Sequence, residues 1–266
     1  MSDFLQTIVR ERLERVRRDA ETGPSRAALR AEAEALRAER RPFLAALRRE
    51  AGTPLRVIAE VKRASPSAGM LQADYDPAAL AREYDGCGAA AISVLTEPAR
   101  FLGSLDDLAR VREAVTLPAL LKDFVVHEHQ IWEAGARGAD AALLIVAALD
   151  RKQLGDYAAL MVELGIAPLV EVHEASEIEA ALAVPGAIGV NNRDLRTLAM
   201  RPGQAEALLP LLPPDRVRVA ESGYKERAAV ERIGRLGADA VLVGESLLRS
   251  GSVAEGYAAL FGSEAM

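Results

Sequence analysis

From residue 56 onward, short apolar runs alternate with amphipathic stretches of helix length. The runs have the length of buried strands, and the stretches between them repeat their apolar positions at helical spacing. Eight runs are present, at residues 56–62, 89–96, 117–123, 140–147, 167–172, 187–192, 216–222 and 238–245. Strands that alternate with helices predict βαβ units and a parallel sheet. Eight such α/β units in roughly 200 residues fit a closed (β/α)8 TIM barrel better than an open doubly wound sheet. No G-x-G-x-x-G motif follows the first run to support the open sheet.

Residues 1–50 differ in texture, because they are rich in Ala, Arg and Glu and space their apolar positions as a helix does. They predict two helices, interrupted near residues 22–25, with Ser25 as the N-cap of the second. We therefore expect an N-terminal helical extension, residues 1–50, that packs on a barrel domain, residues 51–266. The extension is either a solvated charged segment or a helix that lies over the mouth of the barrel, and the sequence leaves both open.

Composition and charge exclude several classes of binding partner, of bound metal and of cellular location. The 266 residues carry a net charge of -6, which provides no basic surface for nucleic acid or for an anionic membrane. The single cysteine, Cys87, excludes an internal disulfide, and no Cys/His cluster predicts a zinc site. The start of the chain lacks the apolar segment of a signal peptide, and no run is long enough to span a membrane. We expect a cytoplasmic protein that acts as a monomer.

Lysine and asparagine are rare, and their positions are informative. Of 33 basic residues only Lys62, Lys122, Lys152 and Lys225 are lysine, and the only asparagines are Asn191 and Asn192. Because arginine is the default cation of this chain, a lysine in an apolar run indicates a function that needs an ammonium group. Unlike a guanidinium, an ammonium can release its proton when its pKa is lowered.

Charged and polar residues collect where the predicted strands end. They are Glu60 and Lys62, Lys122 and Asp123, Glu171, Asn191 to Arg193, and Glu221 and Ser222. Any one of them has an ordinary explanation: a lysine that closes a strand can emerge into water, and Glu171 can be half of a structural ion pair. Burial of unpaired charge is costly, however, and five strands place charge at the same end. Since the active site of such a barrel lies at this end, the pattern predicts one.

Two turns predict a phosphate site. The loops after strands seven and eight of such barrels often bind phosphate through backbone N–H groups. Here they read Glu221-Ser222-Gly223-Tyr224 and Gly244-Glu245-Ser246, in which glycine admits an anion closely and serine adds a hydroxyl donor. Ordinary turns with a capping Ser or Gly would look the same. The loop 65–69 after the first strand is a third tight polar turn, able to hold a second anionic group or to close over a substrate.

Six motifs together carry a family resemblance. AEVKRASPSAG, LLKDF, LVEVH, GVNNRDL, AESG and VLVGESLLRSG, in this order and spacing, closely resemble the indole-3-glycerol phosphate synthase family of tryptophan biosynthesis, and the helical segment before the first strand resembles that family's N-terminal segment. The resemblance implies a carboxy-lyase that cyclises, decarboxylates and dehydrates a phosphorylated small molecule, 1-(2-carboxyphenylamino)-1-deoxyribulose 5-phosphate. It also implies that no cofactor or metal takes part.

The resemblance assigns catalytic roles to five residues. Lys122 is expected to be the general acid of ring closure, and Glu171 the acid/base partner of dehydration. Lys62 would hold the carboxylate of the anthranilate ring or act as a second acid, and the sequence does not divide these roles. Glu60 and Asn191 would orient these groups and the hydroxyls of the sugar chain. Such an inventory suits the reaction, because ring closure needs a proton donor at the carbonyl and a cation near the departing carboxylate.

The same resemblance assigns substrate-binding residues. Ser65 and Arg193 would contribute to anion binding, and Phe124 and Leu195 would form apolar walls around the aromatic ring. The phosphate cradle would be formed by the turns that contain Glu221, Ser222, Gly223, Gly244 and Ser246.

Four positions need separate comment. Ala68 stands where the family often has lysine, which puts in doubt a contact of a loop lysine with substrate, and His127 stands where an acidic residue is common. We expect structural or capping roles for His127 and His129, and packing rather than tuning of Glu171 for His173.

Two rival functions are weighed. Phosphoribosylanthranilate isomerase would require a cysteine base at the end of the first strand, whereas Cys87 lies near the end of the first barrel helix. The other rival is a catalytically inactive phosphate-binding barrel that serves as a binding or regulatory subunit.

Overall fold

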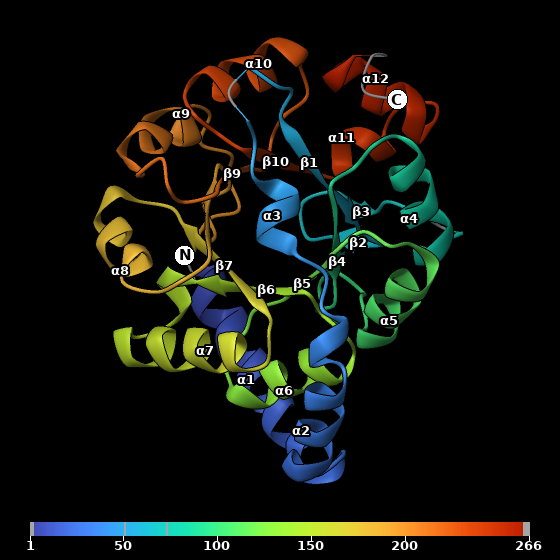
Figure 1. The fold of residues 1–266 in the computed structure, drawn as a ribbon, viewed down its shortest axis with the longest axis vertical. Helices are drawn as coiled ribbons and strands as arrows, with labels where there is room; N and C mark the ends of the chain where they lie inside the picture. Colours follow the sequence, from blue (N-terminus) through green and yellow to red (C-terminus); the bar gives the residue numbers. More distant parts are fainter. Residues whose placement is uncertain (1–2, 51, 73, 263–266) are drawn as a thin grey trace.

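Eight parallel strands close into a barrel in the computed structural model, which describes residues 3–50, 52–72 and 74–262 (Figure 1). The strand order around the barrel is β1-β10-β9-β8-β7-β6-β5-β4. The strands are β1 Arg56–Val61, β4 Ala91–Leu95, β5 Ala119–Lys122, β6 Ala141–Ile145, β7 Ala167–Val172, β8 Ala187–Asn191, β9 Arg218–Glu221 and β10 Ala240–Val243. Each predicted run contains one of these strands, so the predicted (β/α)8 barrel is confirmed. The open sheet is excluded, because β1 pairs with both β4 and β10.

Helices connect successive strands and surround the barrel (Figure 1). They are α4 Pro77–Gly86, α5 Leu105–Ala114, α6 Glu128–Ala136, α7 Arg151–Glu163, α8 Ile178–Leu182, α9 Gln204–Leu208, α10 Arg227–Arg235, α11 Glu245–Leu248 and α12 Val253–Phe261. Short 3-10 helices are η1 Arg37–Glu39, η2 Val146–Ala148, η3 Ala175–Glu177 and η4 Leu209–Leu211. The loop after β1 forms a small hairpin of β2 Ala64–Ser65 and β3 Gly69–Met70. No helix in the described ranges is both long and apolar enough to cross a membrane.

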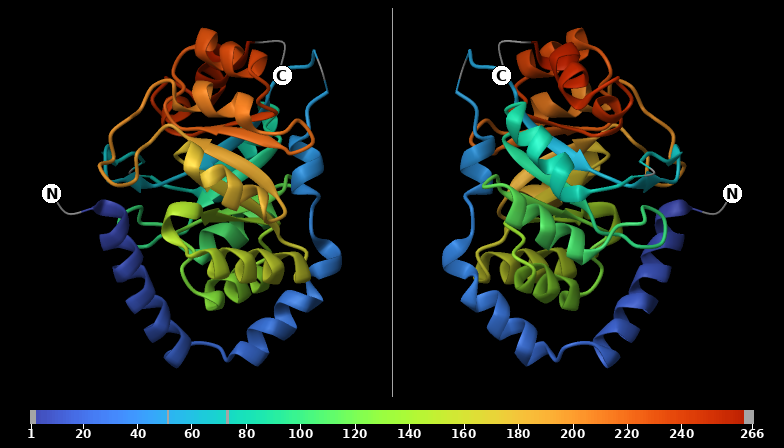
Figure 2. Two further views of the ribbon diagram at one scale, coloured as in Figure 1. Left: turned by 90° about the vertical axis from the view of Figure 1, so that its left-hand side faces the viewer. Right: turned by 90° about the vertical axis from the view of Figure 1, so that its right-hand side faces the viewer.

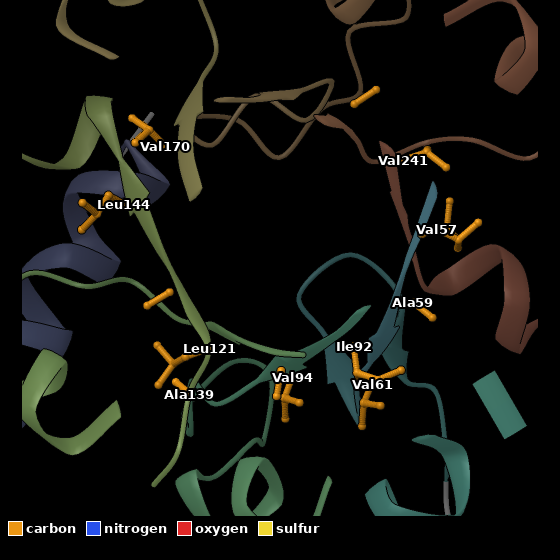
Figure 3. Packing of buried hydrophobic residues seen from close by; sticks show 14 of the residues in the cluster. Val57, Ala59, Val61, Ile92, Val94, Leu121, Ala139, Leu144, Val170 and Val241 are labelled. Atoms are coloured by element: carbon orange, nitrogen blue, oxygen red, sulfur yellow. The ribbon is translucent and has the colours of Figure 1, made fainter. Parts of the chain in front are cut away.

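Alternation along each strand divides the core into two layers. Val57, Ala59 and Val61 pack against the helices together with residues such as Val94 (Figure 3). Ile58 belongs instead to the cluster inside the barrel. Successive side chains of a strand point to opposite faces, so Glu60 follows Ile58 into the barrel. The packing of β1 therefore places the Glu60 side chain inside the barrel. It lies near the C-terminal end of the strand, where the loop to β2 begins.

The N-terminal extension wraps around one side of the barrel (Figure 2). It consists of α1 Phe4–Thr22, α2 Arg26–Ala35, η1 and α3 Phe43–Leu47. The predicted interruption is confirmed, because Ser25 caps α2 by accepting a hydrogen bond from Ala28 N at 3.2 Å. Phe43 and Leu47 of α3 join the inner cluster of the barrel. Residues 1–2, 51, 73 and 263–266, which include the predicted start of the barrel domain at residue 51, lie outside the described residues.

One face of α1 is buried against the loops at the mouth of the barrel. Leu5, Ile8 and Val16 are buried, and Phe4 N donates a hydrogen bond to Arg196 O at 3.0 Å. Arg12 is buried as well and reaches Asp123, the residue that follows β5. Of the two alternatives for the extension, the structure therefore supports the helix at the mouth over the fully solvated segment.

Candidate active site

A cavity of ≈ 270 Å³ opens at the ends of the barrel strands that carry the predicted charges. Thirteen of the fourteen predicted site residues line it: Glu60, Lys62, Lys122, Phe124, Glu171, Asn191, Arg193, Leu195, Glu221, Ser222, Gly223, Gly244 and Ser246. The fourteenth, Ser65, lines a smaller adjoining cavity that shares Lys62, Phe124, Arg193 and Leu195 with the first. The structure therefore brings the predicted residues together at one mouth.

Lys122 lies between two buried carboxyl groups. Its Nζ donates a hydrogen bond to Glu171 Oε2 at 3.3 Å and lies 3.5 Å from Glu221 Oε2. The Lys122 side chain is 14% exposed, whereas Glu171 is 0% exposed. The three residues come from the ends of β5, β7 and β9. The barrel therefore brings them together, because the strand ends meet at one mouth.

The electrostatic environment shifts the pKa values of the two carboxyl groups in opposite directions. Burial alone would lower the pKa of Lys122, but Glu171, Glu221 and Glu60 outweigh burial and raise it. Burial raises the pKa of Glu221, and the neighbouring Glu171 carboxylate raises it further. The pKa of Glu171 is lowered, because Lys122 and His173 overcome its desolvation. Two carboxyls that face one ammonium cannot both ionise cheaply, so the pKa of Glu171 falls while the pKa of Glu221 rises.

A second charge pair lies across the cavity, where Lys62 Nζ donates a hydrogen bond to Glu60 Oε1. Both side chains are largely buried. Glycines make room for the carboxyl groups: a Cβ on Gly244 would lie 2.8 Å from Glu60 Cβ, and one on Gly189 would lie 2.1 Å from Glu221 Oε1. Close approach of backbone to carboxylate therefore requires glycine at both positions.

The environment of His173 differs from the predicted one. The sequence favours a packing role, but the structure places His173 Nε2 3.2 Å from Glu171 Oε1. Burial lowers the pKa of His173, and Glu171 with Glu177 more than reverses this, so the net shift is upward. The prediction of simple packing is wrong, because the side chain follows Glu171 by two residues and turns back toward it beyond the end of β7.

The turns at the rim have unusual backbone and internal hydrogen bonds. Ser222 has φ 67° and Gly223 has φ 85°. A positive φ is strained for serine, and such strain tends to occur at functional sites. Ser246 Oγ donates to Tyr224 O, so the turn after β10 supports the turn after β9. Asn191 Oδ1 accepts a hydrogen bond from Arg193 N at 2.9 Å, which fixes the loop after β8.

Comparison with known proteins gives the family. The sequence model of indole-3-glycerol phosphate synthase matches residues 5–260. The chain belongs to the indole-3-glycerol phosphate synthase family. This confirms the resemblance inferred from the six motifs.

Several indole-3-glycerol phosphate synthases are similar over most of the chain. The protein of that name from Laribacter hongkongensis is 43% identical over 264 residues, which are 98% of this chain and 100% of the relative. The one from Pelodictyon phaeoclathratiforme is 45% identical over 249 residues, 93% of this chain and 96% of the relative. The one from Micrococcus luteus is 54% identical over 202 residues, 76% of this chain and 75% of the relative.

Solved structures support the fold alone. A mutant tryptophan synthase alpha-subunit from Pyrococcus furiosus superposes with a TM-score of 0.60 at 16% identity, covering 78% of this chain and 98% of that one. At this identity the likeness shows only that both chains form the same barrel.

In this member of the indole-3-glycerol phosphate synthase family, the cavity includes residues beyond the fourteen to which the sequence assigned a catalytic or binding role. They are Ser67, Leu95, Phe101, Asp123, Leu143, Ile145, Met200, Tyr224, Lys225, Leu242, Val243 and Glu245. Lys225 could have been found, because it is one of four lysines and follows the predicted turn after β9. Phe101 and Met200 lie in loops that no periodic pattern marks, so only the fold brings them to the mouth.

The positions at which the chain departs from the synthase pattern have structural explanations. His127 is the N-cap of α6 and accepts a hydrogen bond from His129 N at 3.1 Å, which confirms the capping role. Ala68 N donates to Ser65 Oγ at 3.2 Å and so helps close the hairpin. Among the residues that the structure describes, no group of three or more His, Cys, Asp or Glu side chains is arranged to hold a metal ion.

Proposed function

We propose that this chain converts 1-(2-carboxyphenylamino)-1-deoxyribulose 5-phosphate to indole-3-glycerol phosphate, as a carboxy-lyase of tryptophan biosynthesis in the cytoplasm. Family membership supports the overall reaction. The observation that carries the catalytic detail is the contact of Lys122 with Glu171 at the base of a cavity lined by thirteen predicted residues.

The reaction has a definite proton balance. The ring carbon that bears the carboxylate attacks the ketone carbon, a C–C bond forms, and the carbonyl oxygen takes up one proton. Carbon dioxide then leaves, and its bonding electrons restore the aromatic ring. The new hydroxyl takes up a second proton and departs as water, while the methylene carbon beside nitrogen releases one proton. Two protons enter and one leaves, so each turnover consumes one proton.

Lys122 and Glu171 suit the two directions of proton transfer. The raised pKa of Lys122 keeps it protonated, and it can donate to an oxygen that becomes an alkoxide as the ring closes. The lowered pKa of Glu171 keeps it ionised and able to accept a proton during dehydration. Their 3.3 Å contact allows the pair to exchange a proton between the two stages.

The remaining residues divide between the two ends of the substrate. Phe124 and Leu195 would flank the aromatic ring, with Lys62 beside its carboxylate or acting as a second acid. Glu60 and Asn191 would orient these groups. Ser65 and Arg193 support the anion-binding side of the loops.

The phosphate would lie at the turns after β9 and β10, which contain Glu221, Ser222, Gly223, Gly244 and Ser246. Backbone N–H groups of such turns bind anions, and Ser222 adds a hydroxyl donor, whereas the Ser246 hydroxyl donates to Tyr224 O and holds the two turns together.

The test is indole fluorescence on addition of the ribulose phosphate to the protein and to Lys122→Met and Glu171→Gln. Each variant should lose about 100- to 10,000-fold in kcat. Lys152→Met is the matched control, because Lys152 is an exposed lysine on α7 paired with Asp156. Full activity in both site variants would refute the assigned roles. Binding of the substrate without product by the unmodified protein would instead support the inactive phosphate-binding barrel.

A further inference from the structure

Glu171 has two different neighbours, one on each carboxylate oxygen. Oε2 accepts a hydrogen bond from Lys122 on the side of the cavity. Oε1 lies 3.2 Å from His173 Nε2. Glu171 lines the main cavity, whereas His173 lines a separate, small cavity together with Glu174 and Glu177. His173 therefore lies behind Glu171 and does not face the proposed substrate.

Exposure increases along the line from Glu171 through His173 to Glu177. The side chains are 0%, 11% and 15% exposed, respectively. His173 Nδ1 lies 3.9 Å from Glu177 Oε2, on the side away from Glu171. The imidazole thus spans the distance from a fully buried carboxylate to a group that reaches solvent.

Hydrogen bonds fix the backbone of His173, whereas its imidazole makes none to the residues that the structure describes. His173 N donates to Glu177 Oε2, and His173 O accepts from Gln204 Nε2. Over the described part of the chain, neither imidazole nitrogen has a hydrogen-bond partner of good geometry, and Glu171 Oε1 has none either. Buried polar atoms are usually satisfied, so an unpaired imidazole beside an unpaired carboxylate oxygen needs a functional explanation.

We propose that His173 is a proton relay that carries the proton consumed in each turnover from solvent near Glu177 to Glu171. This inference rests on the proposed function, because that reaction takes up one proton. A bound substrate would occupy the mouth, and the Glu171 side chain has no exposed surface of its own. In the step, solvent at the small cavity protonates Nδ1 of the neutral imidazole, and the resulting imidazolium gives its Nε2 proton to Glu171 Oε1. This leaves a neutral imidazole with its proton on Nδ1, which returns to the Nε2–H form by exchange with water before the next turnover.

The charges that face His173 favour this use. Glu171 from β7 and Glu177 from η3 stabilise the imidazolium, while Lys122 from β5 opposes it. Glu174, Asp194 and Arg201 also line the small cavity, and two of these three are acidic. Histidine is the side chain whose ordinary pKa best suits it to pass a proton near neutral pH.

The experiment compares His173→Gln, His173→Ala and the unmodified chain by indole fluorescence between pH 5.5 and 9. Glutamine retains an N–H that can orient Glu171 but cannot relay a proton. We expect kcat of His173→Gln to fall about 100-fold with a small change in KM. Added imidazole should restore kcat of His173→Ala with saturation, and the rescue should follow the fraction of imidazolium. His129→Gln is the matched control, because His129 is a buried histidine of α6 outside both cavities.

Two results would overturn the relay. One is a His173→Gln variant with the kcat and pH profile of the unmodified chain, which would leave His173 only an orienting role. The other is a His173→Ala variant that folds but that imidazole does not rescue. Both differ from failure of the proposed function itself, in which the unmodified chain and His129→Gln form no indole product.

Discussion

The buried ion pair between α1 and the end of β5 predicts a large and specific loss of stability. Arg12 Nε and Nη2 donate to Asp123 at 3.0 and 2.8 Å, and Asp123 also accepts from Thr96 Oγ1 at 3.1 Å and Phe124 N at 2.7 Å. Arg12 and Asp123 are 7% and 3% exposed. Replacement of Arg12 by Met leaves the carboxylate buried without its cation.

The magnitude follows from what remains around Asp123. Removal of one partner of a buried pair typically costs about 3–5 kcal/mol. Since the hydrogen bonds from Thr96 and Phe124 survive, Arg12→Met should lie at the lower end, near 3 kcal/mol. Adding Asp123→Asn removes the stranded charge, so the double variant should be more stable than the sum of the single changes by about 2 kcal/mol.

The assay is urea unfolding followed by the fluorescence of Trp132, the single tryptophan. Trp132 lies on α6 with Arg26 and Arg30 of α2 over its ring at 5.6 and 5.8 Å, so it reports on the extension. The control is Glu11→Gln on the same helix, because Glu11 pairs with Arg100 at 2.8 Å while largely exposed. Such a pair is worth at most about 1 kcal/mol.

The reasoning about α1 fails if Arg12→Met costs no more than Glu11→Gln. It also fails if the double-variant cycle shows no coupling between Arg12 and Asp123. Either result would mean that the Arg12–Asp123 pair does not contribute to holding the extension on the barrel.

Two further predictions concern Glu221. Its pKa is raised, so its stabilising contribution is complete below the unfolded pKa of about 4.3 and is lost as pH rises toward the folded value. Glu221→Gln, which stays neutral, should therefore gain stability relative to the parent between pH 5 and 8 in urea unfolding, and parallel pH profiles would contradict this. Gly189→Ala would place a Cβ 2.1 Å from Glu221 Oε1 and should lower stability by about 1–3 kcal/mol in thermal unfolding, unlike Gly155→Ala, whose Cβ has open space.

The sequence predicted the barrel because its repeating signals are local. Apolar runs of strand length alternate with helical stretches, and each of the eight runs contains a strand. The positions of Lys122, Glu171 and Glu221 followed as well, since parallel strands of one barrel present their ends at the same mouth. Ser25 was found for the same reason, because a helix cap depends on residues within one turn.

Contacts between distant segments followed from tertiary structure alone. Arg12 reaches Asp123 across 111 positions, and nothing near either residue in the chain marks the other. The turn of His173 toward Glu171, and the arrival of Phe101 and Met200 at the cavity, depend on loops without a periodic pattern. The raised pKa of Glu221 is also a result of tertiary structure, because burial and a neighbouring carboxylate are properties of the packed mouth. Local periodicity thus determined which strand-end residues reach the mouth, whereas long-range packing decided how they pair and which loop residues join them.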